Sequence, residues 1–227
     1  MSLPHFASRH RLTATRLAPV VILVAYWLLN PHPALSLLAA GSVVALAGQA
    51  IRLWAAGHLI KHAGGAPPAP LATDGPFAYT RHPLYFGSTL MGVGLCLASG
   101  VWWTFALVAG ILALFYIPTA LREESHLREV YGDGYARYRR AVPGLGVRLT
   151  PYRAGTVPIE GRAAANAQPH RGLSPSGGFA VARVLSNGEH VTSVLTVVLL
   201  AIMWARLAFC WIGSPGNLIG GVPGGGG

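Results

Sequence analysis

Two short polar stretches contain the side chains best suited to bind a small charged molecule. In the first, Arg81 and His82 precede Pro83, and proline is favoured in the first turn of a helix. Cationic side chains at a helix start oppose the helix dipole, so their placement calls for an anionic partner. That partner is either a lipid phosphate or the carboxylate or phosphate of a ligand, and position alone favours the lipid.

The second stretch holds Glu123 and Glu124, two of the seven acidic residues in the chain, soon after an apolar run that ends at Pro118. Adjacent carboxylates on a helix point about 100° apart and repel each other, so packing gives no reason to pair them. They belong either to a solvated helix start, where acids are favoured, or to a site that accepts a ligand's amino group or hydroxyls. Both interpretations are open at this point.

Composition places these stretches in a membrane protein. The chain has 227 residues, of which 52% are apolar and 11% charged, against about a quarter charged in soluble domains. This excludes a largely disordered chain and argues against a soluble globule. Cys96 and Cys210 supply neither a disulfide framework nor a CxxC zinc site, and no ligand set completes His58, His62 and His126. No metal site is predicted.

Five apolar runs predict an all-α integral membrane protein with about five transmembrane helices. The first is interpreted as a retained anchor, because no convincing cleavage site separates it from the second. Outside the apolar runs, Lys and Arg fall only before the first run, between the second and third, and between the fourth and fifth, which predicts a cytoplasmic N-terminus and an outer C-terminus. The formal charge of +10 then faces lipid headgroups, not nucleic acid. The runs are Leu17–Leu29, Ala34–His58, Pro83–Ala98, Val101–Pro118 and Val191–Ile212.

The chain divides into three predicted parts. Residues 1–153 form a core of four spans followed by a helix over Leu121–Arg140 at the cytoplasmic surface, anchored there by tyrosines. Residues 154–190 form a connector rich in Gly, Pro and Ser, and residues 191–227 form the fifth span and a Gly-rich tail. Within the fifth span, Arg206 is expected either to snorkel outward or to face a partner subunit. Cys96 and Cys210 are expected to be free thiols.

The order of these motifs resembles one known family. Arg81-His82-Pro83-Leu84-Tyr85, Gly87 and then Glu123-Glu124 are similar to the isoprenylcysteine carboxyl methyltransferase and phospholipid methyltransferase superfamily. The resemblance extends downstream through Tyr131-Gly132 to Pro143 and upstream through Arg52-Leu-Trp-Ala-Ala-Gly-His-Leu59, so it covers roughly residues 40–150. The superfamily implies S-adenosylmethionine-dependent methyl transfer at the cytoplasmic membrane face.

The resemblance also implies a set of cofactor-binding residues. Arg81 and His82 suit the carboxylate of S-adenosylmethionine through charge-assisted hydrogen bonds. The carboxylates of Glu123 and Glu124 suit its ammonium group and ribose hydroxyls. The complete predicted set is Arg81, His82, Tyr85, Gly87, Glu123 and Glu124.

Further residues are implied for the methyl acceptor. His82 or Tyr85 is placed to take a proton from an amine, whereas a carboxylate or thiolate acceptor needs no general base. Arg139 or Arg140 is expected to orient an anionic acceptor, the simpler alternative being that both snorkel to the membrane surface. Arg52, inside the second span, is either functional or snorkelling.

We therefore expect methyl transfer to a lipophilic acceptor that enters from the bilayer: an isoprenylcysteine-type carboxylate, a phospholipid amine or a thiol. The expected location is the bacterial inner membrane. Two alternatives stay open. One is a structural or accessory subunit of a larger membrane complex, and the other is a related membrane reductase with a nicotinamide cofactor.

Overall fold

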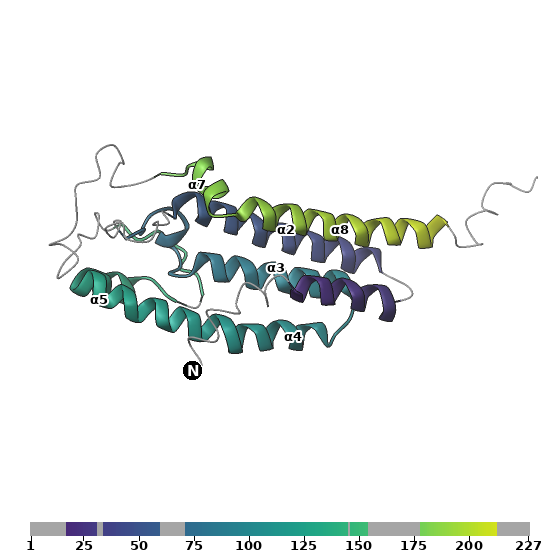
Figure 1. Cartoon of the computed structure of the whole chain (residues 1–227), viewed down its shortest axis with the longest axis horizontal. Helices are drawn as coiled ribbons and strands as arrows, with labels where there is room; N and C mark the ends of the chain where they lie inside the picture. The colour runs from purple at the N-terminus through teal and green to yellow at the C-terminus, as the bar shows by residue number, and fades with distance from the viewer. Residues whose placement is uncertain (1–16, 31–33, 60–70, 145, 154–177, 213–227) are drawn as a thin grey trace, which may run out of the picture.

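The computed structural model describes residues 17–30, 34–59, 71–144, 146–153 and 178–212, and every regular element in these ranges is helical. Three helices are long and apolar enough to cross a membrane: α2 (Leu35–His58), the continuous run Thr104–Ala141, and α8 (Glu189–Ile212). Leu17–Leu29 and α3 (Pro83–Ser99) are apolar but shorter. The helices lie side by side in an elongated bundle (Figure 1). The all-α membrane class is thus confirmed, while five crossings and the orientation stay predictions.

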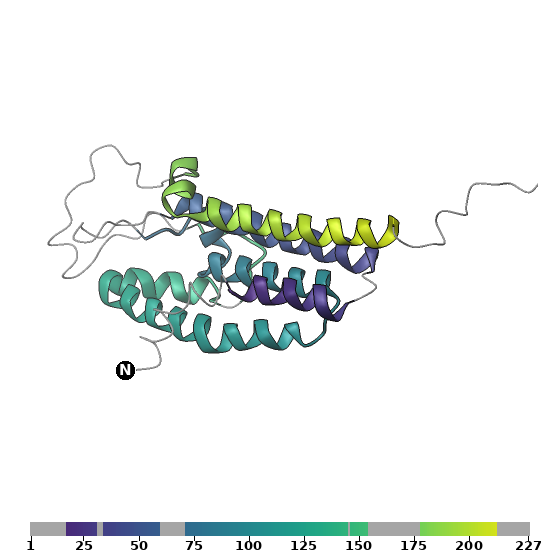
Figure 2. The same cartoon turned by 45° about the vertical axis from the view of Figure 1, so that its right-hand side comes forward.

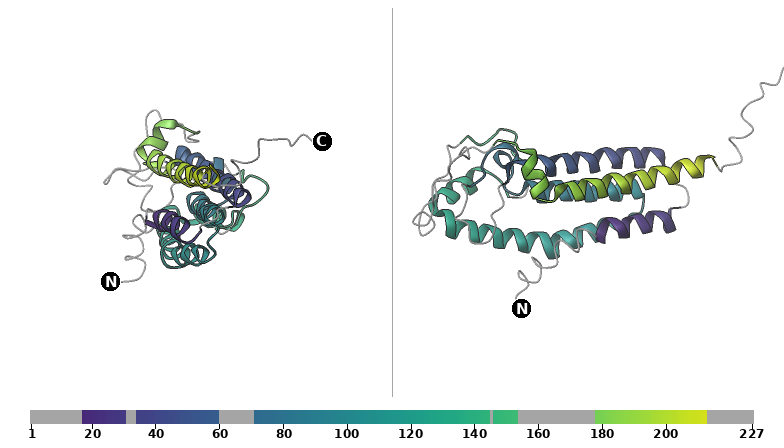
Figure 3. Two further views of the ribbon diagram at one scale, coloured as in Figure 1. Left: turned by 90° about the vertical axis from the view of Figure 1, so that its right-hand side faces the viewer. Right: turned by 45° about the horizontal axis from the view of Figure 1, so that its top comes forward.

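α3 lies at the centre of the bundle, packed between α2 and α4 (Thr104–Ile111), as the end-on view in Figure 3 shows. Its contact with α2 is a contact between backbones. A Cβ atom placed on Gly94 would lie 2.3 Å from the backbone nitrogen of Ala45, and one on Gly48 would lie 2.5 Å from that of Met91. Glycines at such positions let two helices approach closely, so they fix the position of α3 along α2.

The fourth apolar run is longer than predicted. It starts at Thr104, not Val101, and α4, the π-helical turn η2 (Leu112–Tyr116) and the part of α5 (Ile117–Ala141) that precedes Gly132 form one continuous helix. The helix therefore does not end at Pro118, and the helix predicted from Leu121 is its continuation. The location of that part at the membrane surface stays a prediction. A proline ring clashes with the carbonyl four residues earlier, here Leu114, and the wider π-helical turn accommodates it without a break.

The polar half of α5 turns at Gly132, where the chain reverses direction (Figure 2). Gly132 has φ 51° and ψ −128°, a conformation that side chains other than glycine rarely adopt. The turn buries Tyr131, Tyr135 and Tyr138 against one another and Val142. The prediction that these tyrosines anchor a helix at the membrane surface is wrong, because they form a small core of their own.

The C-terminal part packs against α2. The short helix α7 (Val181–Ser186) lies within the predicted connector, and α8 begins at Glu189, two residues earlier than expected. In α8 the Arg206 guanidinium lies over the rings of Tyr26 and Trp27 at 4.8 and 5.1 Å from their centroids. Arg206 therefore has aromatic partners inside the chain, and a partner subunit there stays a prediction. Cys96 and Cys210 are free, as expected.

Several sequence-based predictions concern residues outside the described ranges. These are the basic residues before the first helix, the loop that contains Lys61 and His62, most of the connector, and the Gly-rich tail.

Two glycines provide a matched test of the backbone contact between α2 and α3. Gly94→Ala should destabilise the protein by about 1–3 kcal/mol, because its methyl group has backbone rather than flexible side-chain atoms in its way. Gly110→Ala should be neutral or stabilising by about 0.5–1 kcal/mol, because a Cβ there meets nothing within 4 Å. Unfolding midpoints of the detergent-solubilised variants measure both. Equal midpoints for the two variants would contradict the close approach.

Candidate functional site

The first turn of α3 meets the middle of α5 and brings the two predicted polar stretches together. His82 is the N-cap residue of α3, and Pro83 occupies its first turn as predicted. Glu123 and Glu124 lie in α5, just beyond its apolar part. The loop before α3 is fixed because the backbone N–H of Arg81 donates to the carbonyl oxygen of Pro143 at 2.9 Å.

Glu124 is the centre of this site. One of its carboxylate oxygens, Oε1, lies 2.6 Å from Nη1 of Arg81 and 3.1 Å from Nε2 of His82. The other, Oε2, lies 3.2 Å from Nε of Arg139. Glu124 is only 9% exposed. A carboxylate taken out of water is costly unless it is paired, so the two guanidinium groups supply the charge that its burial requires, and His82 adds a hydrogen-bonding neighbour.

Tyr85 connects this buried pair to the exposed carboxylate beside it. Its hydroxyl donates to Oε1 of Glu123 at 2.7 Å. Its ring stacks on His82 with 5.5 Å between centroids and packs against Tyr116 at 5.1 Å. The two carboxylates therefore differ in environment: Glu124 is buried among cations, and Glu123 is exposed and bound to a phenol.

The segment after α5 forms a wall of the site. The backbone N–H groups of Arg148 and Tyr152 donate to the carbonyls of Tyr79 and Ala78, each at 3.0 Å. At Gly144, a Cβ atom would lie 2.6 Å from Nη2 of Arg81 and 3.3 Å from Oε1 of Glu124. Glycine at this position therefore leaves room directly over the ion pair.

The tyrosines beneath this wall are buried and uncharged. Burial raises the pKa of Tyr138, and it also raises the pKa of Tyr135, beside which Glu124 has the same effect. The Tyr138 hydroxyl therefore stays protonated and donates a hydrogen bond to the carbonyl oxygen of Phe77 at 2.7 Å. This bond ties the end of α5 to the loop that carries Arg81.

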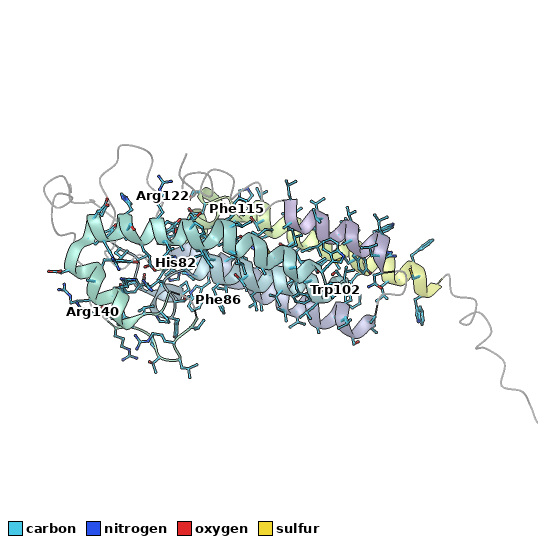
Figure 4. All side chains as sticks on the ribbon, turned by 90° about the horizontal axis from the view of Figure 1, so that it is seen from below. His82, Phe86, Trp102, Phe115, Arg122 and Arg140 are labelled. Carbon is cyan, nitrogen blue, oxygen red and sulfur yellow. The ribbon has the colours of Figure 1, made fainter. Side chains whose placement is uncertain are left out.

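Most of the predicted site residues come together, and two do not. Gly87 faces α2, where a Cβ atom would lie 2.7 Å from the carbonyl oxygen of Gly48. A cofactor contact at Gly87 therefore stays a prediction. Arg140 is exposed, and in Figure 4 it extends away from the bundle while His82 lies between the helices. The clustered residues are Arg81, His82, Tyr85, Glu123, Glu124 and Arg139.

Sequence reasoning missed three contributors. Tyr116 was hidden in an apolar run, and Gly144 was hidden among other loop glycines, although it follows Pro143 directly. Glu189 lies near the site as the ion-pair partner of Arg52, at 2.8 Å. The one available signal was that Glu189 is an acidic residue at the start of an apolar span, where a charge is costly without a partner.

An apolar groove adjoins the site on its membrane side. It lies between the helix Leu17–Leu29, α3 and the α4–η2 segment, and Tyr116 belongs to both the groove and the Tyr85 stack. The polar side chains in its lining are Ser88, Thr89 and Tyr116, and all of them lie near the first turns of α3 or in η2. The remaining lining residues are Ala18, Pro19, Ile22, Met91, Gly92, Leu95, Val108, Ile111 and Leu112.

In comparisons with known proteins, the part of the chain that contains α2, α3 and Glu124 is similar to methyltransferases. Residues 34–134 match the family model described as phospholipid methyltransferase. The chain is 36% identical over 81 residues to the protein-S-isoprenylcysteine O-methyltransferase of Schizosaccharomyces pombe. That match covers 36% of this chain and 34% of the yeast protein, so the chain spans about a third of this relative's length.

Two bacterial relatives match over a longer stretch. The nickel-cobalt-cadmium resistance protein NccN of Alcaligenes xylosoxydans is 30% identical over 159 residues, which are 67% of this chain and 71% of NccN. The cobalt-zinc-cadmium resistance protein CzcN of Cupriavidus metallidurans is 29% identical over 67% of this chain and 70% of its own length. No solved structure matches significantly. With the cluster around Glu124 and these matches, the chain belongs to the isoprenylcysteine carboxyl methyltransferase and phospholipid methyltransferase superfamily.

Proposed function

We propose that this protein transfers a methyl group from S-adenosylmethionine to a lipophilic acceptor in the membrane. The observation that carries the proposal is the position of the Glu124 cluster, where charges of both signs lie next to an apolar groove. The family supports methyl transfer in general. The cofactor, the acceptor and the cytoplasmic side of a bacterial inner membrane belong to the proposal.

The residues present fit the amino-acid end of this cofactor. Arg81 Nε and Nη1 are buried and have no hydrogen-bond partner among the described residues, although Nη1 lies close to Glu124. A buried guanidinium with unsatisfied N–H groups is suited to a carboxylate ligand. Glu123, which is exposed, can accept from an ammonium group. A zwitterionic group would thus satisfy both ends of the cluster without adding net charge.

The bound cofactor would supply a methyl group that its sulfonium already activates. The protein's task is then to orient the reactants and exclude water. The ring stack of His82, Tyr85 and Tyr116 closes the membrane side of the cluster. His82 can take a proton released by an amine acceptor, Tyr85 can take one only by passing its own to Glu123, and the half-exposed Arg139 can pair with an anionic acceptor.

The groove supports an acceptor with a hydrocarbon chain. Its polar lining faces the Tyr85 stack, and its apolar lining extends along α3 from Met91 to Leu95. A lipophilic chain in this groove would hold its polar end near Tyr116 and therefore near the Glu124 cluster. The relatives' names provide two acceptor classes for this end, an isoprenylcysteine carboxylate and a phospholipid headgroup.

The alternative is an accessory subunit of a larger membrane complex. The names of two relatives favour it, because they describe resistance to metal ions and not a reaction. This alternative predicts a folded protein that does not bind S-adenosylmethionine and that copurifies with stoichiometric partners.

Calorimetric titration with S-adenosylmethionine distinguishes these functions. Wild-type protein in detergent should bind saturably. Arg81→Ala and the double variant Glu123→Gln/Glu124→Gln should each weaken binding at least tenfold, about 1.4 kcal/mol, because each removes the partner of one ligand charge. Glu129→Gln is the matched control, because it neutralises an exposed carboxylate elsewhere on α5. Folded wild-type protein that fails to bind would overturn the proposal.

Filling the groove tests the acceptor side separately. Ala18→Phe places a large side chain in the groove from the helix Leu17–Leu29. It should raise KM for a lipophilic acceptor by about tenfold, the lower end of the effect of one misfitted methylene group, and leave cofactor affinity unchanged. Ala201→Phe on the exposed face of α8 is the control. An unchanged KM in Ala18→Phe would show that the acceptor binds elsewhere.

A further inference from the structure

A buried ion pair joins α8 to α2. Nη2 of Arg52 lies 2.8 Å from each carboxylate oxygen of Glu189, and its Nε lies 3.1 Å from Oε2. The two side chains are 11% and 10% exposed. Glu189 stands in the first turn of α8, where the helix dipole also favours a carboxylate. Arg52 is therefore paired within the chain, so of the two alternatives considered for it, a functional role and snorkelling, the second does not hold.

The third nitrogen of Arg52 reaches α3. Nη1 donates to the hydroxyl oxygen of Ser88 and lies 3.5 Å from the carbonyl oxygen of Leu84. The Ser88 hydroxyl in turn donates to that same carbonyl at 2.8 Å. Leu84 precedes Tyr85 of the site, and Ser88 lines the groove. The contacts thus run from Glu189 in α8 through Arg52 in α2 to the first turns of α3.

We propose that Glu189 is a positioning residue for the site, acting through Arg52 to hold the first turns of α3 and the polar lining of the groove. The inference rests on the proposed function for its effect on methyl transfer. Glu189 lies well outside residues 34–134, which match the phospholipid methyltransferase family. The C-terminal helix would thus contribute to the function of the matched domain.

Other hydrogen bonds also join α8 to α2. Gln49 Nε2 donates to Ser193 Oγ at 2.8 Å, and Trp204 Nε1 donates to Ser42 Oγ at 3.1 Å. A buried ion pair also joins two helices no better than apolar side chains of the same volume. In addition to joining α2 and α8, the Arg52 guanidinium binds α3 through Ser88 and Leu84.

The turn before α8 fixes Glu189 opposite Arg52. The side-chain amide of Asn187 donates to the carbonyl oxygens of Ala56 and Leu59, at 2.7 and 3.1 Å, and so binds the C-terminal end of α2. Gly188 follows with φ 75°, in the left-handed region that favours glycine. The backbone thereby places Glu189 beside α2, two residues after the Asn187 side chain that binds the end of that helix.

The test compares Glu189→Gln with Ser193→Ala, which removes the neighbouring α2–α8 hydrogen bond and the bond from the Ser193 hydroxyl to the backbone carbonyl of Glu189 but leaves the Arg52 guanidinium and the Glu189 carboxylate intact. Two quantities are measured on the full chain in detergent. The first is amide hydrogen exchange in residues 83–90. The second is methyl transfer to a lipophilic acceptor. Glu189→Gln should speed exchange in residues 83–90 at least tenfold and lower kcat/KM by about 10- to 100-fold, whereas Ser193→Ala should change each less than twofold.

Arg52→Lys provides a second variant, because it keeps the charge that neutralises Glu189 but lacks the forked guanidinium. It should reproduce the faster exchange in residues 83–90 with an unfolding midpoint near that of the wild type. Unchanged exchange in both variants would overturn the inference, and so would equal effects of Glu189→Gln and Ser193→Ala. Faster exchange in a protein whose wild type neither binds the cofactor nor transfers methyl groups would overturn the proposed function and leave the positioning role in place.

Discussion

The burial of one carboxylate, that of Glu124, determines much of the architecture at the polar end of this protein. A negative charge held out of water needs cations close by, and Arg81 and Arg139 supply them from two places in the chain, with His82 beside Arg81 as a further hydrogen-bonding neighbour. Arg139 follows Glu124 in the same helical run, fifteen residues on, and would lie about 22 Å away in a straight helix. Only the turn at Gly132 brings it back to the carboxylate. The same reversal lets the tyrosines of α5 pack into their own core and places the segment after α5 beside Arg81.

A second constraint sets where α3 begins relative to this carboxylate. Glycines bring α3 into backbone contact with α2, so α3 cannot slide without steric overlap. The Arg52 guanidinium then binds its first turns from the side. Helix starts usually fray and are less protected than helix centres. Here the start carries His82 and Tyr85, and contacts from α2, α5 and the segment after α5 hold it in place.

The parts that the sequence predicted are those that depend on local pattern. Hydropathy located the apolar helices of the described residues, and Pro83 located the start of α3. The resemblance of Arg81-His82 and Glu123-Glu124 to the family's motifs identified the pairs that meet. The parts it missed depend on distant partners. Glu189 lies 137 residues from Arg52, and the sequence around either residue does not identify the other as its partner. Tyr135 and Tyr138 have the spacing of a surface helix, and only the reversal at Gly132 buries them. A proline normally marks a helix boundary, but the π-helical turn that precedes Pro118 accommodates its ring and the helix continues.

The site lies where the apolar part of the Thr104–Ala141 helix gives way to its polar part. Tyr116 is in the apolar part and contacts the groove, whereas Glu123 and Glu124 follow two turns later among charged residues. For the proposed reaction this position solves a solvation problem. Moving a lipid chain into water costs about 0.8 kcal/mol per methylene group, and moving a charged cofactor into the bilayer is costlier still. At this boundary the acceptor chain can stay among apolar side chains while the charged groups of the cofactor meet Arg81, Glu123 and Glu124. The ring of Tyr85 contacts Tyr116 on one side and its hydroxyl binds Glu123 on the other, so this side chain spans the distance over which the two reactants must approach each other.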